Sequence, residues 1–179
     1  MLAAAAAGAS TPAKIGGYTE LLERRQGEQV WNAVAPTFHS QILGPHFEEL
    51  ARDWVRNYAQ GEIGVESGAV GTTDIQDTAG RAKHELDVVA LSPGEKPRTK
   101  NLRIALLGEA KATGRRRGVA DLERLEHLRA VLAAEGHHTA DSRLAVFSEH
   151  GFTRDLVAGA ARRDDVHLID LPLLYGQSA

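Results

Sequence analysis

The alternation of apolar and polar positions predicts an amphipathic helix beginning near Gly44 and Pro45, since proline is well tolerated in the first turn of a helix. Apolar residues follow at positions 47, 50, 51, 54, 55 and 58, which are offsets of 0, 3, 4, 7, 8 and 11. Such spacing places them on one face of a helix. Of two adjacent glutamates, Glu48 lies at the edge of this apolar stripe and Glu49 lies on the polar side.

Two later segments predict neighbouring strands, residues 84–91 (HELDVVAL) and residues 102–111 (LRIALLGEAK). Residues i and i+2 of a strand point to the same face, so Glu109 and Lys111 are expected on one face while Ala110 turns away. A connector with two prolines joins the two strands.

The same alternation predicts that Asp87 shares a face with Val89 and Leu91, as Glu109 and Lys111 share theirs with apolar Leu107. Charged groups on apolar faces cost free energy unless they are paired or bind a metal. The two strands therefore predict a functional site.

The rest of the chain predicts shorter elements in the order expected of an α/β sandwich with a central mixed sheet. Residues 18–35 predict two short helices, or one helix broken at Gly27, and Pro36 is expected to end this piece. The other expected elements are a weak strand at 62–70, a loop or hairpin connection at 72–81, a helix from Val119 ending near Gly136, strands at 143–147 and 166–171, and a helix after Thr153.

Length and composition indicate one globular domain of 179 residues with a formal net charge of −3. The chain has no cysteine, which excludes disulfides and thiolate metal sites, and no apolar run long enough for a membrane span. A cytoplasmic location is expected. We divide the chain into an Ala/Gly-rich, disordered leader at 1–17, a helical extension at 18–43 and a folded domain at 44–175.

Four polar residues are expected on inward faces, namely Glu48, Asp87, Glu109 and Lys111. Converging carboxylates repel one another unless a cation offsets the repulsion, and oxygen ligands suit Mg²⁺ or Mn²⁺. Such a metal polarises a phosphate and lowers the pKa of a bound water, while a nearby ammonium stabilises developing negative charge. The set therefore predicts metal-assisted hydrolysis of a phosphodiester.

A helix glutamate, a strand aspartate and Glu-x-Lys on the next strand resemble the PD-(D/E)xK nuclease superfamily. This resemblance implies a restriction-endonuclease-like α/β/α sandwich and a DNA substrate. It implies that Asp87, Glu109, the backbone carbonyl of Ala110 and Glu48 bind the metal and that Lys111 orients or activates the attacking water. Leu86 precedes Asp87 where many members have proline, and nearby Glu85 is a spectator or a substitute ligand.

Nearly the whole of residues 18–175 is similar to one uncharacterised nuclease-like domain, which follows the ATPase and winged-helix domains of many archaeal and bacterial AAA-type P-loop ATPases. The matching motifs are Val30-Trp31, Gly44-Pro-His-Phe47-Glu48, Trp54, Glu85-Leu-Asp87-Val-Val, Leu107-Gly-Glu-Ala-Lys111 and Ser148-Glu-His-Gly151-Phe152. The resemblance implies an ATPase domain as partner, in cis or in trans. The chain itself has no G-x-x-x-x-G-K-[ST] phosphate loop, so it is expected to be a stand-alone or truncated C-terminal domain.

Alternative interpretations accompany each of these predictions. Glu109 and Lys111 alone would also suit an ordinary salt bridge. The whole domain would also suit a non-catalytic DNA- or partner-binding module, or the remnant of a longer gene. A hydrolase triad is disfavoured because no G-x-S-x-G motif is present.

Other residues allow a binding role and a structural role. Two basic segments either contact DNA phosphates or form solvated loops: Arg115, Arg116 and Arg117, and the earlier set Arg98, Lys100 and Arg103. Both tryptophans, Trp31 and Trp54, are expected in the core, and the eight histidines on the surface without zinc-type spacing.

Overall fold

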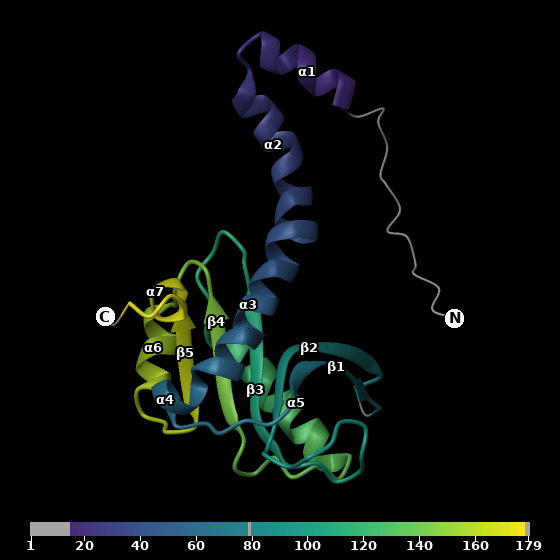
Figure 1. Ribbon diagram of the computed structural model, residues 1–179, viewed down its shortest axis with the longest axis vertical. Coiled ribbons are helices and arrows are strands. Elements are labelled where there is room, and N and C mark those ends of the chain that lie inside the picture. Colours follow the sequence, from purple (N-terminus) through teal and green to yellow (C-terminus); the bar gives the residue numbers. More distant parts are fainter. Residues whose placement is uncertain (1–14, 79, 178–179) are drawn as a thin grey trace.

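A five-stranded sheet in the order β1-β2-β3-β4-β5 forms the centre of the protein, with helices on both faces (Figure 1). The computed structural model describes residues 15–78 and 80–177. The leader predicted at 1–17 lies outside the described residues except for 15–17, which belong to a helix. The strands are β1 (Val70–Asp77), β2 (Ala82–Leu91), β3 (Ile104–Lys111), β4 (Arg143–Ser148) and β5 (Val166–Asp170).

The sheet is mixed, which confirms the predicted α/β class. Strands β1, β2 and β3 form an antiparallel meander, whereas β3, β4 and β5 are parallel. The parallel strands are joined by helices α5 (Val119–Ala134) and α6 (Arg154–Ala160), as parallel connections require. The ends of β3, β4 and β5 therefore meet at one edge, where Lys111 pairs with Ser148 and Ser148 with Asp170.

Two apolar clusters fill the spaces on either side of the sheet. On one face lie α3 (Gly44–Asn57), α4 (Ala59–Ile63) and α7 (Leu171–Leu174), and on the other face lie α5 and α6. Helix α3 buries most of the apolar stripe predicted from its spacing, including Trp54, whose ring meets the edge of Phe147 at a centroid distance of 5.9 Å. The last predicted member, Tyr58, lies just beyond the helix and is 57% exposed. Helix α5 buries its predicted leucines in the same way.

The N-terminal helices extend away from the sheet (Figure 1): the second and third form a column that leads into α3, and the first lies at an angle at its far end. They are α1 (Ile15–Glu23), α2 (Gly27–Phe38) and a π-helical segment, η2 (His39–Leu43). The break predicted at Gly27 is present, but the prediction that Pro36 ends the helix is wrong. Pro36 is exposed inside α2, where water can reach the carbonyl that lost its hydrogen bond, and the wider π turn continues the helix into α3.

Trp31 also departs from its prediction. It is 49% exposed on α2, next to Phe38 at a ring-centroid distance of 5.7 Å, and α2 has no buried residue. Apolar spacing in a helix indicates that one face is apolar, but it does not indicate which part of the protein or which partner covers that face.

Residues 62–77 also differ from the elements that the sequence predicted. The weak strand predicted at 62–70 is wrong: its first two residues belong to α4, which is capped by Gly64 in a left-handed conformation with φ of 67°, and β1 begins only at Val70. The segment predicted as a loop forms β1, in which Ile75 and Asp77 point inward and Gln76 outward. The strand was not predicted because its threonines and aspartates are polar and few of its side chains are buried.

No helix among the described residues is both long enough and apolar enough to cross a membrane.

Candidate functional site

A bulge in β2 sets the position of Asp87. Gly71 pairs with Val89 and Thr73 pairs with Leu86, so Asp87 and Val88 together face the single residue Thr72. The Thr72 hydroxyl donates to the Leu86 carbonyl at 2.8 Å across this irregularity. Leu86 and Val89 consequently reach the same apolar cluster, although strict alternation would send them to opposite faces.

Asp87 does not follow the alternation that the sequence predicted, and its carboxylate points along the sheet toward β3. The pairing of β2 with β3 extends to Val88 and Gly108 and goes no further toward Asp87. Beyond that pair the Ala110 N–H donates to Asp87 Oδ2 at 2.9 Å. The two strands thus form a fork, and the Asp87 carboxylate occupies its opening.

Lys111 joins the two strand carboxylates at this fork. Its Nζ lies 2.8 Å from Asp87 Oδ2 and 3.3 Å from Glu109 Oε1. The side chains of Asp87 and Glu109 are only 3% and 4% exposed, whereas that of Lys111 is 34% exposed. Two buried acids therefore share one ammonium group that water can reach.

Arginines from the helices on both faces hold the same fork. Arg124 of α5 forms an ion pair with Glu109 and donates to the Glu85 carbonyl at 2.7 Å. Arg52 of α3 donates to the Asp87 carbonyl at 2.8 Å. The fork is therefore connected to both helical layers.

Glu48 turns toward the site, and Glu49 turns toward solvent, as their positions on the helix predicted. Glu48 is half-buried, while Glu49 is exposed and binds Arg52 and Arg56. Burial raises the pKa of Glu48 and the charge of Asp87 raises it further, against the opposing charge of Lys111. The charge of Asp87 thus acts on Glu48, so we include Glu48 in the candidate site.

The ionised carboxylates of this site need positive charge close to them. Burial, followed by the charge of Asp87, raises the pKa of Glu109 above its ordinary value, although Lys111 and Arg124 oppose the rise. Burial lowers the pKa of Lys111, but its hydrogen bond to Asp87 and the charge of Glu109 outweigh that effect, so the pKa is raised. Lys111 is accordingly an ammonium at neutral pH.

The structure separates the basic residues that the sequence grouped near the site. Arg115 and Arg116 are exposed on the loop that follows Lys111. Arg117 lies inward, 6% exposed and paired with Asp121, so it does not share their surface as predicted.

The earlier basic set, which comprises Arg98, Lys100 and Arg103, lies in the β2–β3 connector. That connector is at the opposite end of the two strands from Asp87 and Lys111. These three residues therefore do not surround the site.

A second polar group was missed by the sequence prediction. Asp77 at the end of β1, His84 of β2 and His127 of α5 place one ligand atom each within 4.8 Å of one another, and together they could hold a metal ion. Asp77 is buried, and its Oδ2 lies 2.9 Å from His127 Nε2. A prediction of β1 would have placed Asp77 and His84 at one end of a hairpin.

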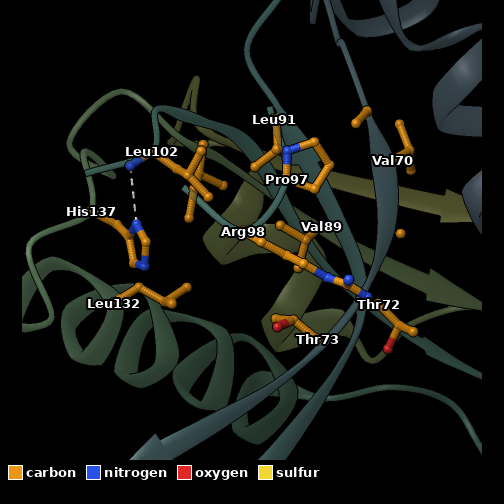
Figure 2. A pocket seen from close by; sticks show the side chains of 13 residues that line it. Val70, Thr72, Thr73, Val89, Leu91, Pro97, Arg98, Leu102, Leu132 and His137 are labelled. Atoms are coloured by element: carbon orange, nitrogen blue, oxygen red, sulfur yellow. Dashed lines mark hydrogen bonds between the residues drawn. The ribbon is translucent and has the colours of Figure 1, made fainter. Parts of the chain in front are cut away.

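A cavity of about 400 Å³ opens at the other end of the hairpin (Figure 2). It is lined by apolar side chains including Val89, Leu91 and Leu132, and also by Arg98 and His137. His137 Nδ1 accepts a hydrogen bond from the Leu102 N–H at 3.2 Å there. None of the four predicted site residues lines this cavity, so we base the candidate site on the fork.

Comparison with protein-family models, curated proteins and solved structures gave no match for this chain.

Proposed function

We propose that this chain is a metal-dependent, endonuclease-like domain that hydrolyses phosphodiester bonds in DNA, with a restriction-endonuclease-like fold. One observation carries the proposal: Asp87 and Glu109, buried on neighbouring strands, meet the ammonium of Lys111 at the fork. An acid pair of this kind requires compensating positive charge, and the half-buried Glu48 adds a third carboxylate, on which the charge of Asp87 acts.

The donor set fits Mg²⁺ or Mn²⁺. Asp87, Glu109 and Glu48 offer carboxylate oxygens, and Ala110 would add its backbone carbonyl, which are the hard oxygen ligands that these ions take. The partial exposure of Lys111 supports access for water and a substrate phosphate. In the absence of metal, Lys111 and Arg124 provide the positive charge beside these acids.

Each residue of the fork has a chemical task in this proposal. A bound divalent ion would polarise the phosphate and lower the pKa of a bound water. Asp87 and Glu109 would hold the ion, and the Ala110 N–H keeps the Asp87 carboxylate oriented. Lys111 orients the attacking water and stabilises the negative charge that develops on the phosphate. Exposed Arg115 and Arg116 contact the phosphates of the DNA backbone.

The adjacent glutamates of α3 provide a matched test. Supercoiled plasmid and branched DNA are incubated with Mg²⁺ or Mn²⁺ and with wild type, Asp87→Ala, Glu109→Ala, Glu48→Gln or Glu49→Gln. We expect cleavage by wild type and Glu49→Gln, loss of cleavage in the two alanine variants, and at least about a tenfold decrease in Glu48→Gln. Cleavage that persists in Asp87→Ala and Glu109→Ala refutes the assignment.

A non-catalytic partner-binding domain is the second candidate, with an AAA-type ATPase as the partner in cis or in trans. The observation that favours it is the helical column, where Trp31, Phe38 and Ile42 are 49%, 37% and 59% exposed. This candidate predicts no cleavage, partner binding that is unchanged in Glu109→Ala, and partner binding that is weakened in Trp31→Ala. Pull-down with a purified ATPase of this class separates the two candidates.

A further inference from the structure

We propose that Asp77, His84 and His127 form a binding site for a first-row transition-metal ion of the Zn²⁺ type, distinct from the oxygen-rich fork. The three residues come from β1, β2 and α5, so an ion bound there would connect the hairpin to the helix. Its donors differ in kind from those of the fork, since two are imidazoles.

The geometry is close to that of a bound site. The three ligand atoms lie within 4.8 Å of one another, and Asp77 Oδ2 and His127 Nε2 are 2.9 Å apart. Ligands at about 2.1 Å from one ion are at most about 4.2 Å apart, so a small side-chain rotation closes the set. The side chain of His127 is 53% exposed and therefore has the freedom to make that rotation.

The Asp77 carboxylate is already held in one orientation by the protein. It is 6% exposed, and its Oδ1 accepts a hydrogen bond from the Gly80 N–H at 2.8 Å. A Cβ atom at position 80 would overlap the Asp77 carboxylate, so glycine is needed for this close approach. Its other oxygen, Oδ2, faces His127 and is the atom that an ion would take.

His84 supplies the second imidazole of the set. Its ring lies 5.8 Å from that of His127 in an edge-on arrangement, and among the described residues its nitrogens make no hydrogen bond. Two imidazoles and one carboxylate suit Zn²⁺ and its neighbours in the first row, whereas Mg²⁺ prefers a shell made entirely of oxygen. The half-exposed position of His127 leaves room for water to complete the coordination.

Titration calorimetry with ZnCl₂ on the purified full chain, in buffer containing 10-fold more Mg²⁺ than Zn²⁺, tests the site. Variants are His84→Gln, His127→Gln and Asp77→Asn, with the exposed His138→Gln as the matched control. We expect one Zn²⁺ per chain in wild type and in the control, and at least about a 100-fold loss of affinity in each of the three variants. Wild type that binds no Zn²⁺, or variants that bind it like the control, overturn the proposal.

Two further measurements separate this site from the fork and from misfolding. The Asp87→Ala/Glu109→Ala variant is expected to keep its Zn²⁺ site, and loss of the site there contradicts the assignment. Nitrogen chemical shifts of the histidine rings, recorded by NMR on wild type, are expected to move on adding Zn²⁺ for His84 and His127 but not for His138. Shifts confined to other histidines refute the proposal without any substitution.

Discussion

Lys111→Met should destabilise the metal-free protein by leaving two buried carboxylates without their shared ammonium. Removing one partner of a fully buried pair costs about 3–5 kcal/mol, and an exposed pair contributes about 0–1 kcal/mol. The side chain of Lys111 is 34% exposed, and Glu109 keeps its ion pair with Arg124, so the cost lies between these limits. We expect about 2 kcal/mol, which is roughly a 30-fold change in the folding equilibrium.

Urea denaturation in the presence of a chelator measures this loss, with Lys83→Met as a matched control. Lys83 pairs with Asp74 on the exposed side of the hairpin, where both side chains are more than half exposed, so its removal should leave the midpoint unchanged. Adding Mg²⁺ should then restore stability to Lys111→Met, because the cation takes over the charge compensation. The Mg²⁺ effect should disappear in Lys111→Met/Asp87→Asn.

Two results would refute this reasoning. One is a Lys111→Met variant as stable as wild type in chelator, which would mean that the acids are neutral or solvated without the lysine. The other is a destabilised variant that Mg²⁺ does not rescue, which would mean that the fork does not bind the ion.

Three more predictions concern packing and pH. Leu128→Ala removes a fully buried side chain of α5 and should cost about 2–5 kcal/mol in urea denaturation, and a cost below 1 kcal/mol would contradict the packing. Gly108→Ala would place a Cβ 3.0 Å from Val88 Cβ and 3.1 Å from Phe147, so the same assay should show a loss of about 1–3 kcal/mol rather than a gain in stability. Burial raises the pKa of Glu109, so with rising pH the carboxyl of the folded protein keeps its proton after that of the unfolded chain has lost it. The free energy of unfolding should therefore fall as pH rises from the ordinary glutamate pKa to the raised pKa. Urea denaturation at a series of pH values should show this fall in wild type and a smaller fall in Glu109→Gln.

The sequence predicted those parts of the fold in which burial follows a simple period. The stripes of α3 and α5 repeat at helical spacing, and both helices lie where they were expected. The segments predicted at 84–91 and 102–111 coincide with most of β2 and all of β3, since their apolar runs are long; β2 begins two residues earlier, at Ala82. Strand β1 was missed because only Ile75 and Asp77 are buried in it.

The candidate site was predicted in composition but not in geometry. Glu48 was selected from helical spacing, and Asp87, Glu109 and Lys111 by assuming regular alternation, whereas the bulge at Asp87 brings its carboxylate to the Ala110 N–H. A bulge depends on pairing between strands, so one strand's sequence does not reveal it. The contacts of Arg124 and His127 depended in the same way on where α5 docks.

Helix α5 carries both of these residues less than one turn apart, with Arg124 on Glu109 of the fork and His127 on Asp77 of the hairpin. A rigid rotation or slide of this helix would therefore pull on both acidic groups at once. Its buried leucines oppose such a movement, because they interlock with the sheet. An engineer who wishes to alter one group and keep the other is thus restricted to exchanging single side chains, since any change in the path of α5 disturbs the two groups together.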